Sequence, residues 1–100
     1  MKTTITETDG KVIVAVQGEL DTDSCEQFQT DIASVAEGSN QAVELDLGRM
    51  EYISSKALRV IISFQQRITG QGGSLKVTHV LPAVREVFDM TGLSKSFQVE

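Results

Sequence analysis

The chain has 100 residues, of which 40% are hydrophobic and 23% are charged, and its formal net charge is −5. This composition is that of an ordinary soluble globular protein, and a chain of this length buries about two-thirds of its unfolded surface without metals or disulfides. We therefore expect residues 1–100 to form one domain. The basic residues form no stripe along the sequence, so nucleic acid is not an expected partner.

The cysteine content and the apolar runs bear on the cellular compartment. Cys25 is the single cysteine, which excludes an intramolecular disulfide and fits a reducing compartment. We expect its side chain to fill a small space in the core. The longest clean apolar run, residues 12–16, is too short to span a bilayer, and residues 1–7 lack the apolar centre of a signal peptide. We therefore expect a cytoplasmic protein without a membrane partner.

Two β-branched stretches near the start of the chain predict a hairpin. Residues 4–7 and 11–17 flank Asp9-Gly10, a dipeptide that suits a tight turn. The second stretch is apolar on both faces from residue 12 to residue 16, so we expect it inside the sheet and the first stretch at the edge. The segment 18–21 is expected to end the second strand.

Three later segments have apolar residues at helical spacing. The first helix is expected to be capped by Asp21 or Thr22 and to stop at Gly38. The second, which follows Ser54, has the strongest periodicity in the chain and one wide apolar face. The third is expected to carry Pro82 in its first turn.

Strands are expected between these helices. Residues 42–47 alternate between apolar and polar, residues 75–80 form a further strand, and Phe97 and Val99 form a last short one. Since each later strand follows a crossover helix, we expect these strands to be parallel. The predicted fold class is therefore α/β, with an antiparallel N-terminal hairpin, parallel crossover strands and three main helices.

Ser54 and Ser55 stand where the strand 42–47 passes through a short loop into the second helix. One serine hydroxyl suffices to cap a helix. The other is left in the first turn, at the positive end of the helix dipole, where an added phosphate is favoured. The pair indicates a regulatory phosphorylation site, and the simpler alternative is that both serines only cap the helix.

The acidic residues Glu19, Asp21 and Asp23 form a second notable cluster. Their simplest role is to cap a helix and to solvate its first turn. The alternative is a binding loop beside Ser55, because both segments follow the carboxyl ends of strands, where α/β sheets usually form binding surfaces.

Groups for catalysis are scarce. His79 is the only histidine, no carboxylates stand at metal-ligand spacing with a second histidine, and no serine lies in a Gly-x-Ser-x-Gly elbow. The glycines within 70–73 follow a helix, whereas phosphate-binding loops lead from a strand into a helix. A triad of Ser55, His79 and Asp46 is conceivable, but a lone histidine at a strand end is more often an ordinary surface residue. We expect no enzyme activity, no cofactor and no metal.

Three segments together resemble the STAS domain, the family of bacterial anti-sigma factor antagonists: Gly-Glu-Leu-Asp at 18–21, Val-Glu-Leu-Asp-Leu at 43–47, and Tyr-Ile-Ser-Ser-Lys-Ala-Leu-Arg-Val at 52–60. The resemblance covers nearly the whole chain and implies a mixed sheet of four to five strands packed with three main helices. In the family, the second hydroxyl position of the third segment is a phosphorylated serine. Ser55 takes that place, and Ser54 is the secondary candidate.

The third segment departs from the family pattern at three positions. Ser54 stands where many members carry Asp, Lys56 where a small residue is usual, and Ala57 where Gly is favoured. Ala57 adds a methyl group at a crowded approach of strand and helix. Lys56 offers a cation that can pair with a phosphate or hinder docking of a kinase.

The resemblance also implies a function. The unphosphorylated form would bind an anti-sigma factor that is a serine kinase and so release a sigma factor, and phosphorylation of Ser55 would block the binding until a metal-dependent serine phosphatase reverses it. We expect a monomer or weak dimer. The surface should also include residues 49–52, taken as a loop, and the charge of Asp46. The expected partner-binding residues are Glu19, Asp21, Thr22, Asp23, Tyr52, Ser54, Ser55, Lys56 and Arg59.

A second function stays open beside this one. The chain could be a STAS scaffold that is never phosphorylated, as a subunit of a signalling or lipid-transport assembly, with both serines acting only as caps.

Overall fold

The computed structural model describes residues 1–37, 42–92 and 98–99, so the predicted helix stop at Gly38 and the predicted strand residue Phe97 lie outside the described residues. The elements along the chain are β1 (Lys2–Thr8), β2 (Lys11–Leu20), α1 (Cys25–Glu37), β3 (Ala42–Ile53), α2 (Ser55–Gly70), β4 (Ser74–Thr78), α3 (Pro82–Met90) and β5 (Gln98–Val99).

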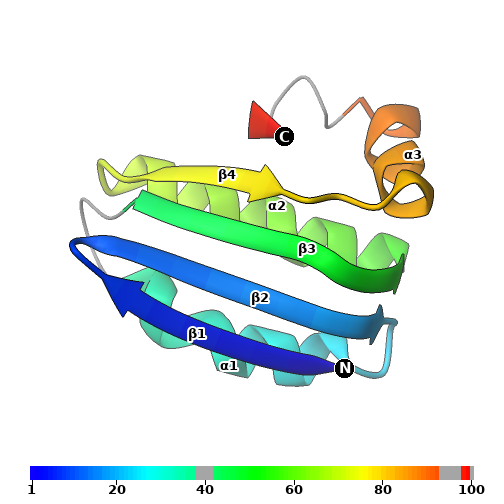
Figure 1. The fold of residues 1–100 in the computed structure, drawn as a ribbon, viewed down its shortest axis with the longest axis horizontal. Helices are drawn as coiled ribbons and strands as arrows, with labels where there is room; N and C mark the ends of the chain where they lie inside the picture. The colour runs from blue at the N-terminus through cyan, green and yellow to red at the C-terminus, as the bar shows by residue number, and fades with distance from the viewer. Residues whose placement is uncertain (38–41, 93–97, 100) are drawn as a thin grey trace.

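The strands form one mixed sheet in the order β1-β2-β3-β4-β5 (Figure 1). β1 and β2 pair antiparallel, with Ile5 opposite Val14, and the other neighbouring strands pair parallel. The hairpin turns through Asp9 and Gly10, whose φ angles of 50° and 79° suit a dipeptide that tolerates left-handed backbone. The predicted mixed α/β sheet with an N-terminal hairpin and parallel crossover strands is confirmed.

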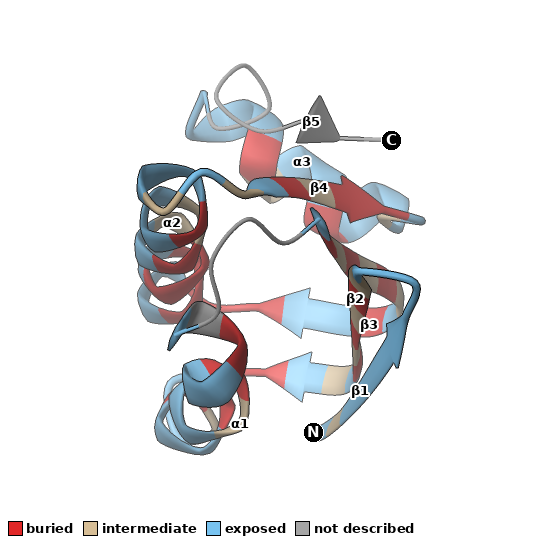
Figure 2. Ribbon diagram, turned by 90° about the vertical axis from the view of Figure 1, so that its left-hand side faces the viewer, coloured by how far each residue is buried: buried red, intermediate tan, exposed pale blue. Residues whose placement is uncertain are grey.

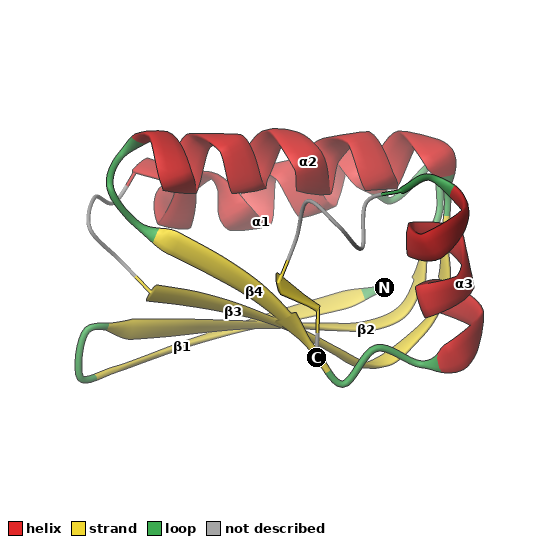
Figure 3. Cartoon of the chain, turned by 90° about the horizontal axis from the view of Figure 1, so that it is seen from above, coloured by secondary structure: helices red, strands yellow, loops and turns green. Residues whose placement is uncertain are grey.

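The helices cover only one face of the sheet. Figure 3 shows α1 and α2 side by side over that face, α3 at the end of the sheet where β3 ends, and the opposite face uncovered. The buried residues of the helices face the strands (Figure 2). Cys25 is fully buried, as predicted. The largest fully buried side chains are Phe28, Phe88, Leu20, Leu45, Leu47, Met50, Ile61, Ile68, Val14, Val16, Val77 and Val84.

β3 is longer than predicted, because it continues through the segment that was expected to be a loop at 49–52 and ends at Ile53. Its buried residues Leu47, Met50 and Ile53 are three apart, which does not fit the period of two that a regular strand requires. The pairing with β2 explains the spacing, because β3 has a bulge of one extra residue at two places. The first bulge lies between the pairs Ala15–Asp46 and Gln17–Arg49. The second lies just before the pair Glu19–Tyr52. Each bulge turns the next apolar residue back toward the core.

Other boundaries also differ from the sequence prediction. β2 does not break at 18–21 but runs to Leu20, since Gly18 adopts a φ of 92° beside one of the bulges. β4 stops at Thr78 instead of residue 80, and His79 follows with a φ of 58°. α3 begins at Pro82, as predicted. In the part of the chain that the structure describes, no helix combines the length and the apolar character needed to cross a membrane.

Candidate functional site

Ser54 forms the N-cap of α2, as the sequence predicts for one of the two serines. Its backbone is extended, with φ −85° and ψ 163°, and its Oγ accepts a hydrogen bond of 3.1 Å from the backbone N–H of Ala57. Its carbonyl accepts the first bond of the helix, from Leu58. The residue is only 7% exposed. The Ser54 hydroxyl is therefore a structural group beneath the surface.

Ser55 is the first residue of α2 and is exposed. Lys56 beside it is exposed as well, and so is Arg59, which lies one turn later on the same face of the helix. The N–H groups of the first turn have no partner within a helix, and the helix dipole is positive at this end. A phosphate on Ser55 would thus stand at a favourable helix end with two cationic side chains on neighbouring positions.

The turn before α1 is held by Asp21 and Ser24. The Ser24 N–H donates to Asp21 Oδ1 at 2.9 Å, and the Asp21 N–H donates to Ser24 Oγ at 3.0 Å. Ser24 Oγ also donates to Asp21 Oδ1, at 2.9 Å. The two bonds that the carboxyl accepts from Ser24, first from the backbone N–H and then from Oγ, lower the pKa of Asp21. α1 itself begins at Cys25, later than a cap at Asp21 or Thr22 predicts. Sequence reasoning missed Ser24, although an acceptor and a donor three residues apart are the signal of a reciprocal cap.

The ends of β2 and β3 bring this turn against the start of α2. Glu19 pairs with Tyr52 and Leu20 with Ile53, and the Ser54 N–H then donates to the Leu20 carbonyl at 2.9 Å. On the inner side, the Cys25 sulfur lies 4.0 Å from Ser54 Oγ. Two segments that are distant in sequence thus form one continuous edge.

We refer to this edge as the Ser55 edge. Tyr52 is 51% exposed there, an unusual environment for an aromatic side chain in a protein with few of them. Asp21 is half-buried and Ser54 is buried. The residues of the Ser55 edge that are exposed are Glu19, Thr22, Asp23, Tyr52, Ser55, Lys56 and Arg59.

Asp46 and His79 do not belong to the Ser55 edge. Asp46 lies seven residues before the end of β3 at Ile53, which is roughly 20 Å along the strand. His79 Nδ1 lies 3.3 Å from Asp46 Oδ1. These two members of the conceivable triad are therefore neighbours, but Ser55 follows the far end of the strand, and the geometry does not assemble a Ser55–His79–Asp46 triad. The expectation that the charge of Asp46 adds to the Ser55 edge is wrong for the same reason.

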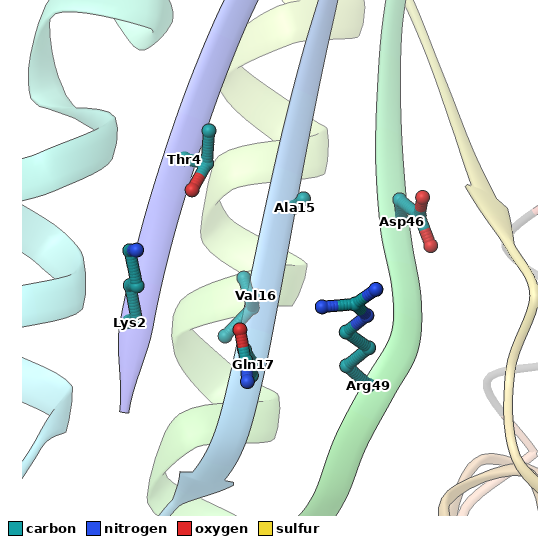
Figure 4. Close-up of a pocket in the computed structure, with 7 residues that line it drawn as sticks. All are labelled: Lys2, Thr4, Ala15, Val16, Gln17, Asp46 and Arg49. Carbon is teal, nitrogen blue, oxygen red and sulfur yellow. The ribbon is translucent and has the colours of Figure 1, made fainter.

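A shallow hollow of about 220 Å³ lies on the uncovered face of the sheet, between β1, β2 and β3 (Figure 4). Of the residues that line it, only Asp46 and Arg49 were expected at the partner-binding surface. The lining residues are Lys2, Thr4, Ala15, Val16, Gln17, Asp46 and Arg49. The Ser55 edge is thus a surface of exposed side chains at a different place from this hollow, a form that suits contact with another protein.

Comparisons with known proteins agree with this fold. Residues 3–99 match the family described as "Mlab, STAS domain". The chain is 35% identical over 99 residues to BtrV of Bordetella bronchiseptica, a protein named as an anti-sigma factor antagonist, and the match spans 99% of this chain and 85% of that protein. The chain belongs to the STAS domain family.

Solved structures show the same architecture. An anti-sigma factor antagonist from Mycobacterium paratuberculosis superimposes with a TM-score of 0.89 at 28% identity, over 98% of this chain and 83% of that chain. The Bacillus protein SpoIIAA has been solved in unphosphorylated and phosphorylated forms, with TM-scores of 0.83 and 0.76 at 19% identity. Those matches span 99% of this chain and 88% and 91% of the two SpoIIAA chains. At 19% identity the match to SpoIIAA shows the common fold.

Proposed function

We propose that this protein is an anti-sigma factor antagonist that is switched by phosphorylation of Ser55. The unphosphorylated form binds, through the Ser55 edge, an anti-sigma factor that is a serine kinase, and a sigma factor is released as a result. A metal-dependent serine phosphatase returns the modified protein to its binding form. The names of the relatives support the general role, and the arrangement at the start of α2 supports the switch.

The observation that carries the proposal is the different environment of the two serines. Ser54 is 7% exposed and its hydroxyl accepts the N–H of Ala57, so this hydroxyl is not available to a kinase. Ser55 is exposed on the same edge as Tyr52 and Asp23. Of the two serines at the start of α2, a kinase that docks on this edge would therefore meet only the hydroxyl of Ser55.

The charge of a phosphate explains how the modification would block binding. A phosphoserine carries about −1.5 to −2 charges at neutral pH, and burying such a charge in an interface without a partner costs several kcal/mol. A loss of about 3 to 5 kcal/mol corresponds to a decrease in affinity of roughly two to four decades. The exposed carboxylates of Glu19 and Asp23 on the same edge would add to the repulsion of an acidic partner surface.

The cations at Lys56 and Arg59 have the opposite effect in the free protein. Lys56 adjoins Ser55 in the first turn of α2, Arg59 lies one turn later on the same face, and both can pair with the phosphate in water. The phosphorylated protein should therefore stay folded, and the switch should act on binding and leave stability nearly unchanged. Lys56, at a position where a small residue is usual in the family, should thus help the folded protein to accommodate the phosphate.

The first experiment identifies the modified residue. The purified protein is incubated with its kinase-fold anti-sigma factor and ATP, and its intact mass is measured. We expect the addition of one phosphate, which is lost in Ser55→Ala and retained in Ser54→Ala. A phosphate mapped to Ser54, or none on the wild type, contradicts the proposal and favours the unphosphorylated scaffold.

The second experiment tests the role of charge. Ser55→Asp is titrated calorimetrically against the anti-sigma factor beside Ser63→Asp, a matched control that places the same charge on an exposed position two turns farther along α2. We expect Ser55→Asp to bind at least tenfold more weakly and Ser63→Asp to bind like the wild type. Equal affinities for all three proteins at equal stability would exclude the electrostatic switch.

The third experiment locates the interface. Hydrogen exchange with and without the anti-sigma factor should show protection of residues 19–24, of residues 49–52 at the end of β3 and of the first turn of α2. Protection confined to α3 and the turn at 70–73 would exclude the Ser55 edge as the docking surface.

A further inference from the structure

A second group of polar residues lies on the uncovered face of the sheet, across β3 and β4. Glu44, Asp46 and His79 each place a ligand atom within 4.8 Å of the other two. The pairing of the strands causes this proximity, since Asp46 lies opposite Thr78 and His79 follows directly. In Figure 4 Asp46 projects from β3 on the side toward β4. Nothing in the proposed function uses these residues, which are roughly 20 Å from the Ser55 edge.

The hydrogen bonds around His79 determine which ring nitrogen faces the cluster. Nδ1 lies 3.1 Å from Thr78 Oγ1 and 3.3 Å from Asp46 Oδ1. The Thr78 hydroxyl donates its proton to Glu44 Oε2 at 2.9 Å, so toward His79 it can only accept. Nδ1 is thus the ring nitrogen that faces the cluster, where it lies among oxygen atoms of a carboxylate and a hydroxyl.

We propose that Glu44, Asp46 and His79 bind a divalent transition-metal ion, of which Zn²⁺ fits best, between His79 Nδ1 and the two carboxylates. Zinc binds histidine nitrogen and carboxylate oxygen at about 2.0 to 2.2 Å, and two tetrahedral ligands at that distance are about 3.4 Å apart. The separation between His79 Nδ1 and Asp46 Oδ1 is 3.3 Å. In the complex Nδ1 donates its lone pair to the ion, and the neutral ring carries its one proton on Nε2.

Asp46 and Glu44 are also each held in place by a further group, as is usual for metal sites. The Gly48 N–H donates to Asp46 Oδ1 at 2.9 Å, and Lys11 Nζ lies 2.8 Å from Glu44 Oε1. A Cβ at Gly48 would lie 3.2 Å from both Asp46 Oδ1 and the Cβ of His79. The glycine thus permits the close approach of the two ligands.

Space beside the cluster can hold the remaining water ligands. Two open hollows meet at His79, one of about 520 Å³ that Glu44 and Thr78 also line, and one of about 530 Å³ that Asp46 also lines. Arg49 lines the second hollow and shows no ion pair with any residue that the structure describes. Its positive charge beside Asp46 opposes a dication, so the affinity should be moderate and should increase when this charge is removed.

Zinc binding is tested on the full chain, without a histidine tag, by calorimetric titration with ZnCl₂. We expect one site per chain that His79→Asn and Asp46→Asn each weaken at least tenfold. Asn is a suitable replacement at position 79 because it tolerates the φ of 58°. Asp31→Asn, which removes a half-buried carboxylate on α1, is the matched control and should bind zinc like the wild type. Arg49→Gln should bind several-fold more tightly.

A spectroscopic readout keeps the test independent of stability. The chain has one histidine, so its two ring nitrogens give an unambiguous pair of ¹⁵N resonances. Saturating zinc should move the Nδ1 resonance to the position of a metal-bound nitrogen and leave Nε2 protonated. Unchanged imidazole resonances at millimolar zinc, or equal affinity of His79→Asn and the wild type, would overturn the proposal. Because Ser55 is distant, loss of zinc binding in these variants should leave phosphorylation of Ser55 unaffected.

Discussion

Replacement of Ser54 by Ala is expected to destabilise the protein, whereas the same replacement at Ser55 is not. Ser54→Ala removes the acceptor of the Ala57 N–H at 3.1 Å in a position that is 7% exposed. Loss of an N-cap costs about 0.5–2 kcal/mol, and a buried donor without a partner costs about 1–3 kcal/mol. We therefore expect the free energy of unfolding to fall by about 1.5–2 kcal/mol.

This loss translates into a measurable change in Tm. The entropy of unfolding is about 2.1 cal/mol/K per residue, so a chain of this length loses about 5 °C per kcal/mol and Ser54→Ala about 7–10 °C. Ser55→Ala changes an exposed residue of the first turn and should shift the unfolding free energy by less than about 0.5 kcal/mol. Ser54→Thr keeps the acceptor oxygen and should recover more than half of the loss.

Thermal melts and urea denaturation of the four proteins check this prediction. Equal slopes in urea would show that the variants differ in stability and not in the extent of unfolding. Equal Tm values for Ser54→Ala and Ser55→Ala would refute the assignment of Ser54 as the structural serine. That result would also remove the reason for assigning phosphorylation to Ser55 and not to Ser54.

Three further changes test other parts of the fold. Gly18→Ala should lower the free energy of unfolding by about 1 kcal/mol, because the φ of 92° is unfavourable for any residue with a Cβ; an unchanged urea midpoint would contradict the left-handed backbone at Gly18. Ala57→Gly, which restores the residue that the family favours, should cost about 1 kcal/mol through lower helix propensity and should leave phosphorylation intact. Hydrogen bonds from Lys11 and then Thr78 lower the pKa of the Glu44 carboxyl, so the stabilisation is present above the unfolded-state value of 4.5 and is lost as the pH falls through the folded-state pKa. The stability difference between wild type and Glu44→Gln should accordingly shrink below about pH 4.5, and a constant difference in urea midpoints from pH 7 to pH 3 would disprove this coupling.

The elements that depend on local interactions could be predicted from the sequence. The Asp9-Gly10 turn, the amphipathic face of α2, the cap at Ser54 and the start of α3 at Pro82 each follow from the conformational preference of a few adjacent residues. The order of a hairpin followed by alternating helices and strands then limits the sheet to antiparallel pairing first and parallel pairing afterwards.

Only the tertiary structure shows where β3 ends and which residues of β2 and β4 lie beside it. The buried residues Leu47, Met50 and Ile53 do not alternate, and only the pairing with β2 shows that two bulges keep them on one strand. The same pairing places Glu19 beside Tyr52 at the Ser55 edge, and the pairing of β3 with β4 brings Asp46 to His79 at the opposite face. Such contacts depend on the register between strands that are distant in sequence, and register is determined by the packing of the whole sheet against its helices, which no local pattern of residues encodes.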